Sequence, residues 1–206
     1  MNVNFQSGRL ILRGESEAET AALVAWKEQH SGHVLLAQTD HGSGMSLAVL
    51  GPQSLACREP LNVLSTHPDE QVRLISNFAA TPFELEGEPY GSVEGFWQGL
   101  KFADPAERRR VALLAGTEAK NAAAGLDSVE FITWEGCQIR AGSPEHWRLM
   151  HQACWAKFSQ HEAAKAALLA TYPRHLQHRV RRDSRTIPGA IMADIWMRIR
   201  DKLREN

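Results

Sequence analysis

The sequence predicts an α+β fold that is mainly helical, with a small α+β extension at its N-terminus. Two observations support this prediction. The 206-residue chain is 43% hydrophobic and 23% charged, which is typical of a soluble globular protein. Its pattern also changes near residue 58, because residues 1–58 combine short apolar runs with one helix, whereas helical periodicity dominates residues 59–206. We therefore expect an extension over 1–58 and a main domain over 59–206.

The extension is expected to run strand, helix, strand, strand. A short apolar run over 8–14 indicates the first strand. The helix over 16–30 opens with a serine and a glutamate in capping-box spacing. Two further apolar runs, 33–38 and 45–50, are separated by the turn-rich segment TDHGSG, which predicts a hairpin.

Helical periodicity recurs along the main domain and predicts six helices, over 92–102, 104–116, 118–125, 143–161, 161–171 and 188–203. Pro105 suits the first turn of the second helix, and Thr117 is placed to cap the third. A hairpin is expected around Glu86-Gly87, and a strand over 129–134. One face of the helix over 143–161 is expected to be a core stripe of Trp147, Met150, Cys154 and Phe158.

The composition argues against several classes of protein. The net charge of -1 gives no general attraction to nucleic acid or to an anionic membrane. No apolar run approaches the ~20 residues that cross a bilayer, and the N-terminus lacks the pattern of a secretory signal. Three cysteines without CxxC spacing favour neither a disulfide framework nor a zinc site. The sequence therefore predicts a cytoplasmic protein without metal or cofactor, for which nucleic acid is not the favoured partner.

The helix over 92–102 has an unusual polar face. Glu94, Gln98 and Lys101 stand at positions i, i+4 and i+7, so an acid, an amide and an amine share one side. Gly95 and Gly99 flank this row, although glycine is unfavourable inside a helix. Two interpretations stay open. The row is either a solvated face whose glycines admit another helix, or a site where a flat base or sugar approaches the backbone across the glycines.

Several motifs of the main domain resemble those of the NADAR (YbiA-like) family. In chain order they are an S-N-F triplet, the pattern S-x-E-x-x-x-Q-x-x-K-F, an Ala-Lys pair, a tryptophan at a strand end, and a helix that contains A-K-F. The matching residues are Ser76, Asn77, Phe78, Ser92, Glu94, Gln98, Lys101, Phe102, Ala119, Lys120, Trp134, Met150, Ala156, Lys157 and Phe158. The resemblance covers about residues 61–203 and leaves only the extension outside.

The resemblance implies a YbiA-like domain that cleaves the N-glycosidic bond of a ribosylated compound, either a phosphorylated riboflavin-pathway intermediate or an ADP-ribosylated base. It implies Glu94 and Lys101 as catalytic residues. It also implies a set of substrate-binding residues, namely Asn77, Phe78, Gln98, Trp134, Lys120, Lys157 and Asp183. Arg182, from the basic cluster around Asp183, is a further substrate-binding candidate. The chain departs from the family after Asp183, where Pro188-Gly189 stands in place of W-G-x-G and G-x-N-x-L-G motifs. This departure indicates a branch with different substrate contacts.

The side chains of the polar row also suit this chemistry when they are considered without the resemblance. Breaking a ribosyl C–N bond builds positive charge at the anomeric carbon, which the Glu94 carboxylate can stabilise. The same group can instead activate water or protonate the leaving base. Lys101 can hold a phosphate, steady the carboxylate or form a Schiff base with a ring-opened ribose. The alternative function is a non-catalytic module that binds a nucleotide or ADP-ribose, and an interaction protein without a small-molecule site comes third.

A basic cluster between residues 174 and 185 is the remaining candidate feature. Its arginines are Arg174, Arg179, Arg181, Arg182 and Arg185. Guanidinium groups match phosphate oxygens, whether of a small ligand or of a nucleic-acid backbone, but a run of charges is usually a solvated surface. The nearby His175-x-x-His178 pair has no third ligand, so a metal site is not expected there.

Overall fold

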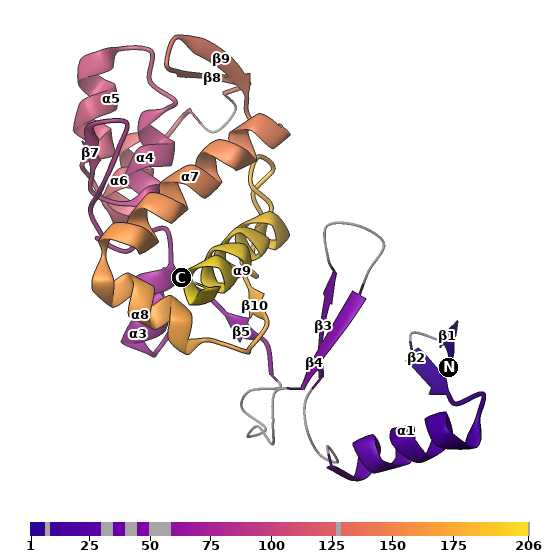
Figure 1. Cartoon of the computed structure of the whole chain (residues 1–206). Helices are drawn as coiled ribbons and strands as arrows, with labels where there is room; N and C mark the ends of the chain where they lie inside the picture. The colour runs from indigo at the N-terminus through magenta and orange to yellow at the C-terminus, as the bar shows by residue number, and fades with distance from the viewer. Residues whose placement is uncertain (7–8, 30–34, 40–44, 50–58, 127–128, 206) are drawn as a thin grey trace. The chain divides into compact units, whose positions relative to one another are not determined.

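The computed structural model describes residues 1–6, 9–29, 35–39, 45–49, 59–126 and 129–205. The chain divides into two compact units, Met1–Arg58 and Glu59–Asn206 (Figure 1).

The first unit contains two antiparallel strand pairs and one helix. Strand β1 (Asn2–Gln6) pairs with β2 (Arg9–Arg13), helix α1 covers Glu17–Gln29, and β3 (Leu35–Thr39) pairs with β4 (Met45–Val49). The predicted capping interaction is present, because the Glu19 N–H donates to the Ser16 hydroxyl oxygen at 3.2 Å. Strand β1 was not predicted, and the turn expected over 39–44 lies almost wholly outside the described residues.

The second unit is mainly helical, with short strands that pair two by two. Its helices are α3 (Glu70–Ile75), α4 (Val93–Gly99), α5 (Pro105–Ala112), α6 (Gly116–Ala122), α7 (Pro144–Gln160), α8 (Glu162–Ala170) and α9 (Gly189–Glu205). The antiparallel pairs are β6 (Phe83–Leu85) with β7 (Glu88–Tyr90) and β8 (Phe131–Trp134) with β9 (Cys137–Arg140); β5 (Leu61–Asn62) and β10 (Leu176–Gln177) are parallel. The predicted mainly helical α+β class is confirmed.

The predicted helix starts are correct to within one residue except in α6, whereas α4 and α5 end earlier than predicted. Helix α5 has Pro105 in its first turn, with the Asp104 carboxylate accepting from the Ala106 N–H at 3.2 Å. The prediction for α6 was wrong, since that helix begins at Gly116, before Thr117, and has no side-chain cap. In the described parts of the chain, no helix combines the length and the apolar character that a membrane span requires.

Both hairpins of this unit turn at a Glu-Gly pair. Glu86 and Gly87 have φ of 50° and 78°, and Glu135 and Gly136 have 47° and 76°. Tight hairpin turns need positive φ at both central residues, which explains why glycine occupies the second position. The hairpin at Glu86 was predicted, whereas β9, beyond the second turn, was not.

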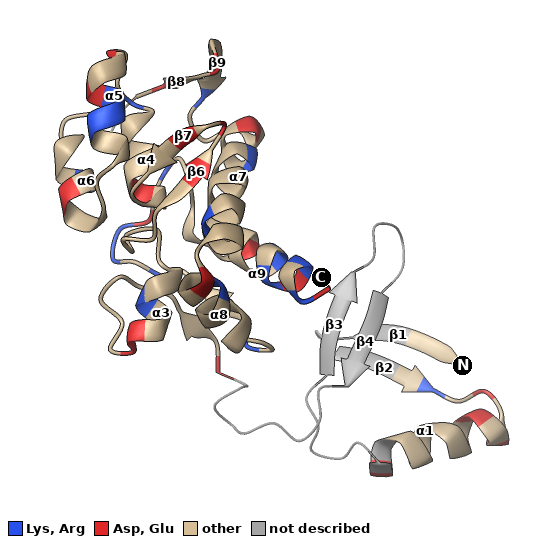
Figure 2. Ribbon diagram, turned by 60° about the vertical axis from the view of Figure 1, so that its left-hand side comes forward, with Lys and Arg blue, Asp and Glu red and all other residues tan. Residues whose placement is uncertain are grey.

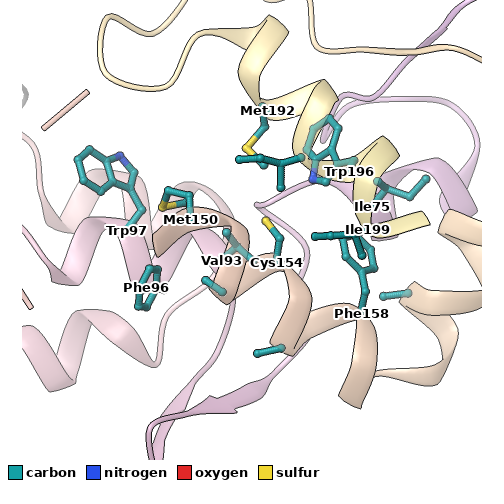
Figure 3. Packing of buried hydrophobic residues seen from close by; sticks show 14 of the residues in the cluster. Ile75, Val93, Phe96, Trp97, Met150, Cys154, Phe158, Met192, Trp196 and Ile199 are labelled. Carbon is teal, nitrogen blue, oxygen red and sulfur yellow. The ribbon is translucent and has the colours of Figure 1, made fainter. Parts of the chain in front are cut away.

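Helix α7 lies at the centre of the core and contacts α4, α8 and α9 (Figure 1). Figure 3 shows Cys154 of α7 and Met192 of α9 pointing toward one another among the buried side chains. The predicted stripe of α7 is correct at Met150, Cys154 and Phe158 but not at Trp147. The buried residue at that end is His146, and Trp147 is half-buried with its indole N–H donating to the Thr186 carbonyl oxygen at 2.8 Å.

The charged residues of α9 lie from Asp194 to its C-terminal end, and Figure 2 shows blue and red segments along this part of the helix. They include the exposed pair Arg198 and Asp194, whose N and O atoms are 2.8 Å apart. Exposed pairs of this kind contribute little to stability. The apolar face of the same helix supplies Met192, Ile195, Trp196 and Ile199 to the core.

The two glycines of α4 face the backbone of the segment over 108–114. A Cβ atom on Gly95 would lie 2.7 Å from the Ala112 carbonyl oxygen and closer still to that of Leu114. A Cβ atom on Gly99 would lie 3.0 Å from the Arg108 carbonyl oxygen. The expectation that a ligand approaches α4 across its glycines was therefore wrong. The other interpretation holds for the glycines, which let the neighbouring segment approach, but not for the solvated face, because Glu94 and Gln98 are only 8% and 5% exposed.

We expect Gly95→Ala to destabilise the protein by about 3 kcal/mol, because backbone carbonyls cannot move aside for the added methyl group. Gly99→Ala is the matched control on the same helix. Its looser contact is offset by the better helix propensity of alanine, so its effect should stay within about 1 kcal/mol. Urea unfolding followed by tryptophan fluorescence measures both, and equal stability of the two variants would contradict this account.

Candidate functional site

The N-terminus of α4 fixes the position of Glu94. The Ser92 hydroxyl accepts a hydrogen bond from the Gly95 N–H at 2.8 Å and donates one to the Leu114 carbonyl oxygen at 2.9 Å. The Glu94 N–H donates to the carbonyl oxygen of Asn77 at 2.9 Å. The S-N-F turn and the start of α4 are thereby joined at the residue that sequence reasoning placed at the centre of the site.

The Glu94 carboxyl group is held away from water. The residue is 8% exposed, and its Oε1 accepts a hydrogen bond from Gln98 Nε2 at 2.7 Å. Burial raises the pKa of Glu94 above its ordinary value, while the Gln98 bond and the charges of Lys120 and Lys101 partly oppose that rise. The carboxyl group therefore keeps its proton at a pH where an exposed glutamate has lost it.

Two lysines flank this carboxyl group, and each lies over an aromatic ring. The Lys101 amine is 5.1 Å from the Trp97 ring centre, and the Lys120 amine is 5.8 Å from that of Phe78. Lys120 comes from α6 and is exposed, whereas Lys101 is half-buried. Two cations, each beside a flat apolar ring, thus act on the Glu94 carboxyl group. Such a set can hold an anionic ligand that carries a ring.

Asn77 takes part mainly through its backbone. Its side-chain amide turns toward sulfur atoms of the core, with Nδ2 3.1 Å from Met192 Sδ and Oδ1 3.9 Å from Cys154 Sγ. The Asn77 carbonyl oxygen holds the Glu94 N–H. These contacts give Asn77 a role in orienting the acid.

Lys157 lies beneath this turn. It is fully buried, and its amine donates to the carbonyl oxygens of Ile75 at 3.1 Å and Ser76 at 2.8 Å. Burial lowers the pKa of the amine to about 7. The structure thus gives Lys157 a supporting position at the end of α3 instead of the ligand-facing position that was expected.

Trp134 lies on a different side of α4. Its ring meets that of Phe96 edge-on, with centres 5.5 Å apart. Phe96 is two residues beyond Glu94, which corresponds to about 200° around a helix. Trp134 also lines a separate pocket of about 330 Å³ together with Tyr90, Phe96 and Arg109. The structure does not bring Trp134 into the group around Glu94.

Arg182 and Asp183 lie in the segment before α9, and both are exposed. The Asp183 Oδ1 accepts from the N–H groups of Ser184 and Gly189, each at 2.9 Å. Asp183 thus caps the start of α9. Among the described residues, no group of three or more potential metal-binding side chains is present.

Sequence reasoning missed two residues of the site, His146 and the ring of Trp97. The two rings have centres 4.4 Å apart, and Lys101 lies near both. Figure 3 shows Trp97 and Phe96 leaving α4 on different sides. Neither residue was among those that the sequence predicted for the site. His146 lies four residues before Met150, so it falls on the same face of α7. A predicted stripe that began at His146 instead of Trp147 would have included it.

A comparison of the sequence with protein-family models identifies the family of this chain. The model described as Bacteriophage protein GP30.3 matches residues 71–192, which is more than half of the chain. The chain belongs to the GP30.3 family. This family is NADAR/YbiA-like, as the sequence motifs predicted. The matched range contains all the candidate site residues, from Asn77 to Asp183.

Relatives of this GP30.3-family chain include phage and bacterial proteins. An uncharacterized 17.1 kDa protein of Enterobacteria phage T4 is 28% identical over 136 residues, which are 63% of this chain and 90% of the phage protein. N-glycosidase YbiA of Escherichia coli K12 is 30% identical over 111 residues, and that of Shigella boydii is 32% identical over 114. The matches cover 53% of this chain and 64% of YbiA, so the chain spans less than two thirds of these enzymes.

The NMR structure of E. coli YbiA confirms the fold. It superimposes with a TM-score of 0.53 at 22% identity, covering 72% of this chain and 87% of YbiA.

Proposed function

We propose that this GP30.3-family protein is an N-glycosidase that hydrolyses the C–N bond between a ribose and a base in a phosphorylated compound. The observation that carries the proposal is the buried Glu94 carboxyl group, which is hydrogen-bonded to Gln98 and flanked by Lys101 and Lys120. The relatives named N-glycosidase support the same class of reaction.

The raised pKa of Glu94 suits a general acid. In the proposed step the C1′–N bond breaks, and its electron pair goes to the nitrogen of the leaving base. That nitrogen takes the proton of Glu94. Water then bonds to C1′ and gives a proton back to the carboxylate, so the enzyme returns to its starting state. The carboxylate formed in between stabilises the positive charge that develops on the ribose.

The lysines and the rings supply binding. Lys120 is exposed and Lys101 half-buried, so both can hold the phosphate groups of a substrate whose base lies against Trp97 or Phe78. Two substrate types fit this description. One is a phosphoribosylaminopyrimidine of the riboflavin-pathway type, and the other is ADP-ribose linked to a nucleobase.

The test is incubation with a panel of both substrate types and of nucleoside 5′-monophosphates, followed by mass spectrometry for free base and ribose phosphate. Release from at least one compound, lost in Glu94→Gln, is the expected result. Binding of a compound without release would instead identify a non-catalytic nucleotide-binding module. No release and no binding across the panel would reject both functions.

Lys101 has either an electrostatic or a covalent role. If its amine forms a Schiff base with the opened ribose, borohydride added during turnover should trap an adduct of ribosyl mass on Lys101. Peptide mapping of the wild type and of Lys120→Ala should show this adduct. Reduced activity in Lys101→Ala without any adduct in the wild type would indicate a charge role, and full activity would remove Lys101 from the mechanism.

A further inference from the structure

The pocket beside Trp134 is separate from the site of Glu94 and has no part in the proposed reaction. Its volume of about 330 Å³ lies at the lower end of the range for small-molecule sites, which is about 300–1,000 Å³. Its walls come from the hairpin of β6 and β7, from α4 and α5, and from the turn between β8 and β9. The pocket is therefore large enough for a small molecule with one ring.

Three aromatic rings line the interior of this pocket. The ring centres of Tyr90 and Phe96 are 5.0 Å apart with their planes at 78°, and those of Phe96 and Trp134 are 5.5 Å apart at 71°. Phe96 and Tyr90 are 1% and 9% exposed and lie at its inner end, whereas Trp134 is half-buried. Rings that meet at such angles present their π faces in several directions, and proteins use such sets of rings to bind organic cations.

The Tyr90 hydroxyl group has no hydrogen-bond partner in the described part of the chain, although Tyr90 is more than nine-tenths buried. A ligand in the pocket can supply that partner. Burial and, next, the charge of Glu88 raise the pKa of Tyr90 to about 12, while the charge of Arg108 opposes the rise with a smaller effect. The hydroxyl group therefore stays protonated at neutral pH, and the electrostatic field at its oxygen favours a positive group.

Three glutamates, Glu86, Glu88 and Glu135, line the open side of the pocket, where all three are exposed. Glu86 and Glu135 occupy the first central positions of the two hairpin turns, with φ of 50° and 47°. Asparagine, aspartate and glycine are the residues preferred at such positions, so turn geometry does not explain a glutamate in both. What the two turns share is this pocket, to whose rim each contributes an acid.

Two arginines also belong to the lining. The Arg108 guanidinium group donates to the carbonyl oxygens of Phe102, at 2.8 and 3.1 Å, and of Thr133, at 3.1 Å, which fixes it in the wall. Arg109 is exposed. Two arginines against three glutamates leave one net negative charge on the lining.

We propose that this pocket binds a small organic cation, whose apolar body lies against the rings of Tyr90, Phe96 and Trp134 and whose ammonium group donates to the Tyr90 hydroxyl oxygen. The ring faces and the glutamates of the rim both attract a positive charge. An organic anion would instead meet three carboxylates. The inference does not depend on the proposed N-glycosidase function, because Glu94 is not part of this pocket.

Three probes with the same aromatic body test the charge that the pocket selects. They are phenethylamine, the neutral phenethyl alcohol and the anionic phenylacetate. Proton–nitrogen NMR follows the Trp134 indole N–H, which is assigned with Trp134→Phe, as each probe is added. We expect phenethylamine to bind about 10-fold more tightly than phenethyl alcohol, and phenylacetate to bind more weakly than either. Equal affinities, a preference for phenylacetate, or no binding of phenethylamine would each overturn the proposal.

Variants of the full chain locate the binding. Glutamine at both Glu86 and Glu135 keeps the shape of the side chains and should weaken phenethylamine binding about 10-fold. Tyr90→Phe keeps the ring without its hydroxyl group and should weaken binding about 3-fold. Glu118→Gln, on the exposed surface of α6, and Glu94→Gln should both bind phenethylamine like the wild type. Undiminished affinity in the double variant and in Tyr90→Phe would overturn the proposal, whereas loss of hydrolysis with binding retained in Glu94→Gln would show that the two sites are distinct.

Discussion

Replacing Glu94 with glutamine is expected to lower kcat by about 10²- to 10⁴-fold, the range for loss of a general acid. Glutamine keeps the shape of the side chain and a carbonyl oxygen that can accept the Gln98 bond, but it has no proton to give. KM should therefore stay near the wild-type value. Steady-state kinetics on the hydrolysed panel compound, from pH 5 to pH 9, measure both constants.

The pH profile gives a second measure of the same role. If Glu94 donates its proton, wild-type kcat should fall as pH rises through the raised pKa of the carboxyl group. Glu118→Gln, on the exposed surface of α6, is the control and should leave kcat unchanged. A Glu94→Gln variant with near wild-type kcat would exclude an acid–base or electrostatic role.

The Glu94→Gln variant should be more stable than the wild type at alkaline pH, although it is less active. The folded pKa of Glu94 lies above the ordinary value of 4.5, so the stability linked to its proton is fully present below about pH 4.5 and is lost as pH rises through the folded pKa. Above that pKa the wild type holds a buried charge that Glu94→Gln lacks. The variant should therefore unfold at a higher temperature near pH 8, with the difference closing on acidification.

The polar row was predictable because it depends only on helical geometry. Once residues 92–102 form a helix, Glu94, Gln98 and Lys101 must share a side, whatever surrounds them. The use of the row was not predictable to the same degree. Glycines in a helix can make room either for a ligand or for another part of the chain. Only the structure shows that the space beside Gly95 is filled by the carbonyl oxygens of Leu114 and Ala112.

The residues that were misplaced depend on contacts distant in sequence. Nothing local in the strand that ends at Trp134 shows that its ring meets Phe96, away from Glu94. In the sequence, Lys157 does not differ from an ordinary solvent-facing lysine of a helix. Its burial follows from its contact with the carbonyl oxygens of Ile75 and Ser76 at the end of α3. The two-residue pairing of β5 with β10 joins the beginning of the second unit to the segment before α9 and has no sequence pattern of its own.

The largest stability effect is expected from Lys157→Met measured above neutral pH. A neutral amine still has two N–H groups, enough for both the Ile75 and the Ser76 carbonyl oxygens. Methionine leaves the Ile75 oxygen without the amine donor and the Ser76 oxygen with only the Ala79 N–H at 3.1 Å, and the two losses together cost about 2–4 kcal/mol. Because the same turn presents the Asn77 carbonyl to the Glu94 N–H, kcat should fall as well.

The size of this effect should depend on pH in a defined direction. Burial lowers the folded pKa of Lys157 from 10.5 to about 7, so at low pH the folded protein bears the cost of a buried ammonium. That cost is relieved as pH rises from about 7 toward 10.5, because the folded protein then binds fewer protons than the unfolded chain. Methionine does not titrate, so Lys157→Met should lack this dependence of the unfolding free energy on pH.

Urea unfolding of the wild type and of Lys157→Met at pH 6 and pH 9 tests both parts of the argument. The difference in unfolding free energy between the two proteins should be about 2–3 kcal/mol larger at pH 9, since about two pH units of the titration lie in that interval. Lys165→Met, at a half-buried lysine of α8 whose amine lies 3.8 Å from the Glu162 carboxylate, should show no such dependence. A constant difference at both pH values would mean that Lys157 stays charged in the fold, with the two carbonyl oxygens compensating for its burial.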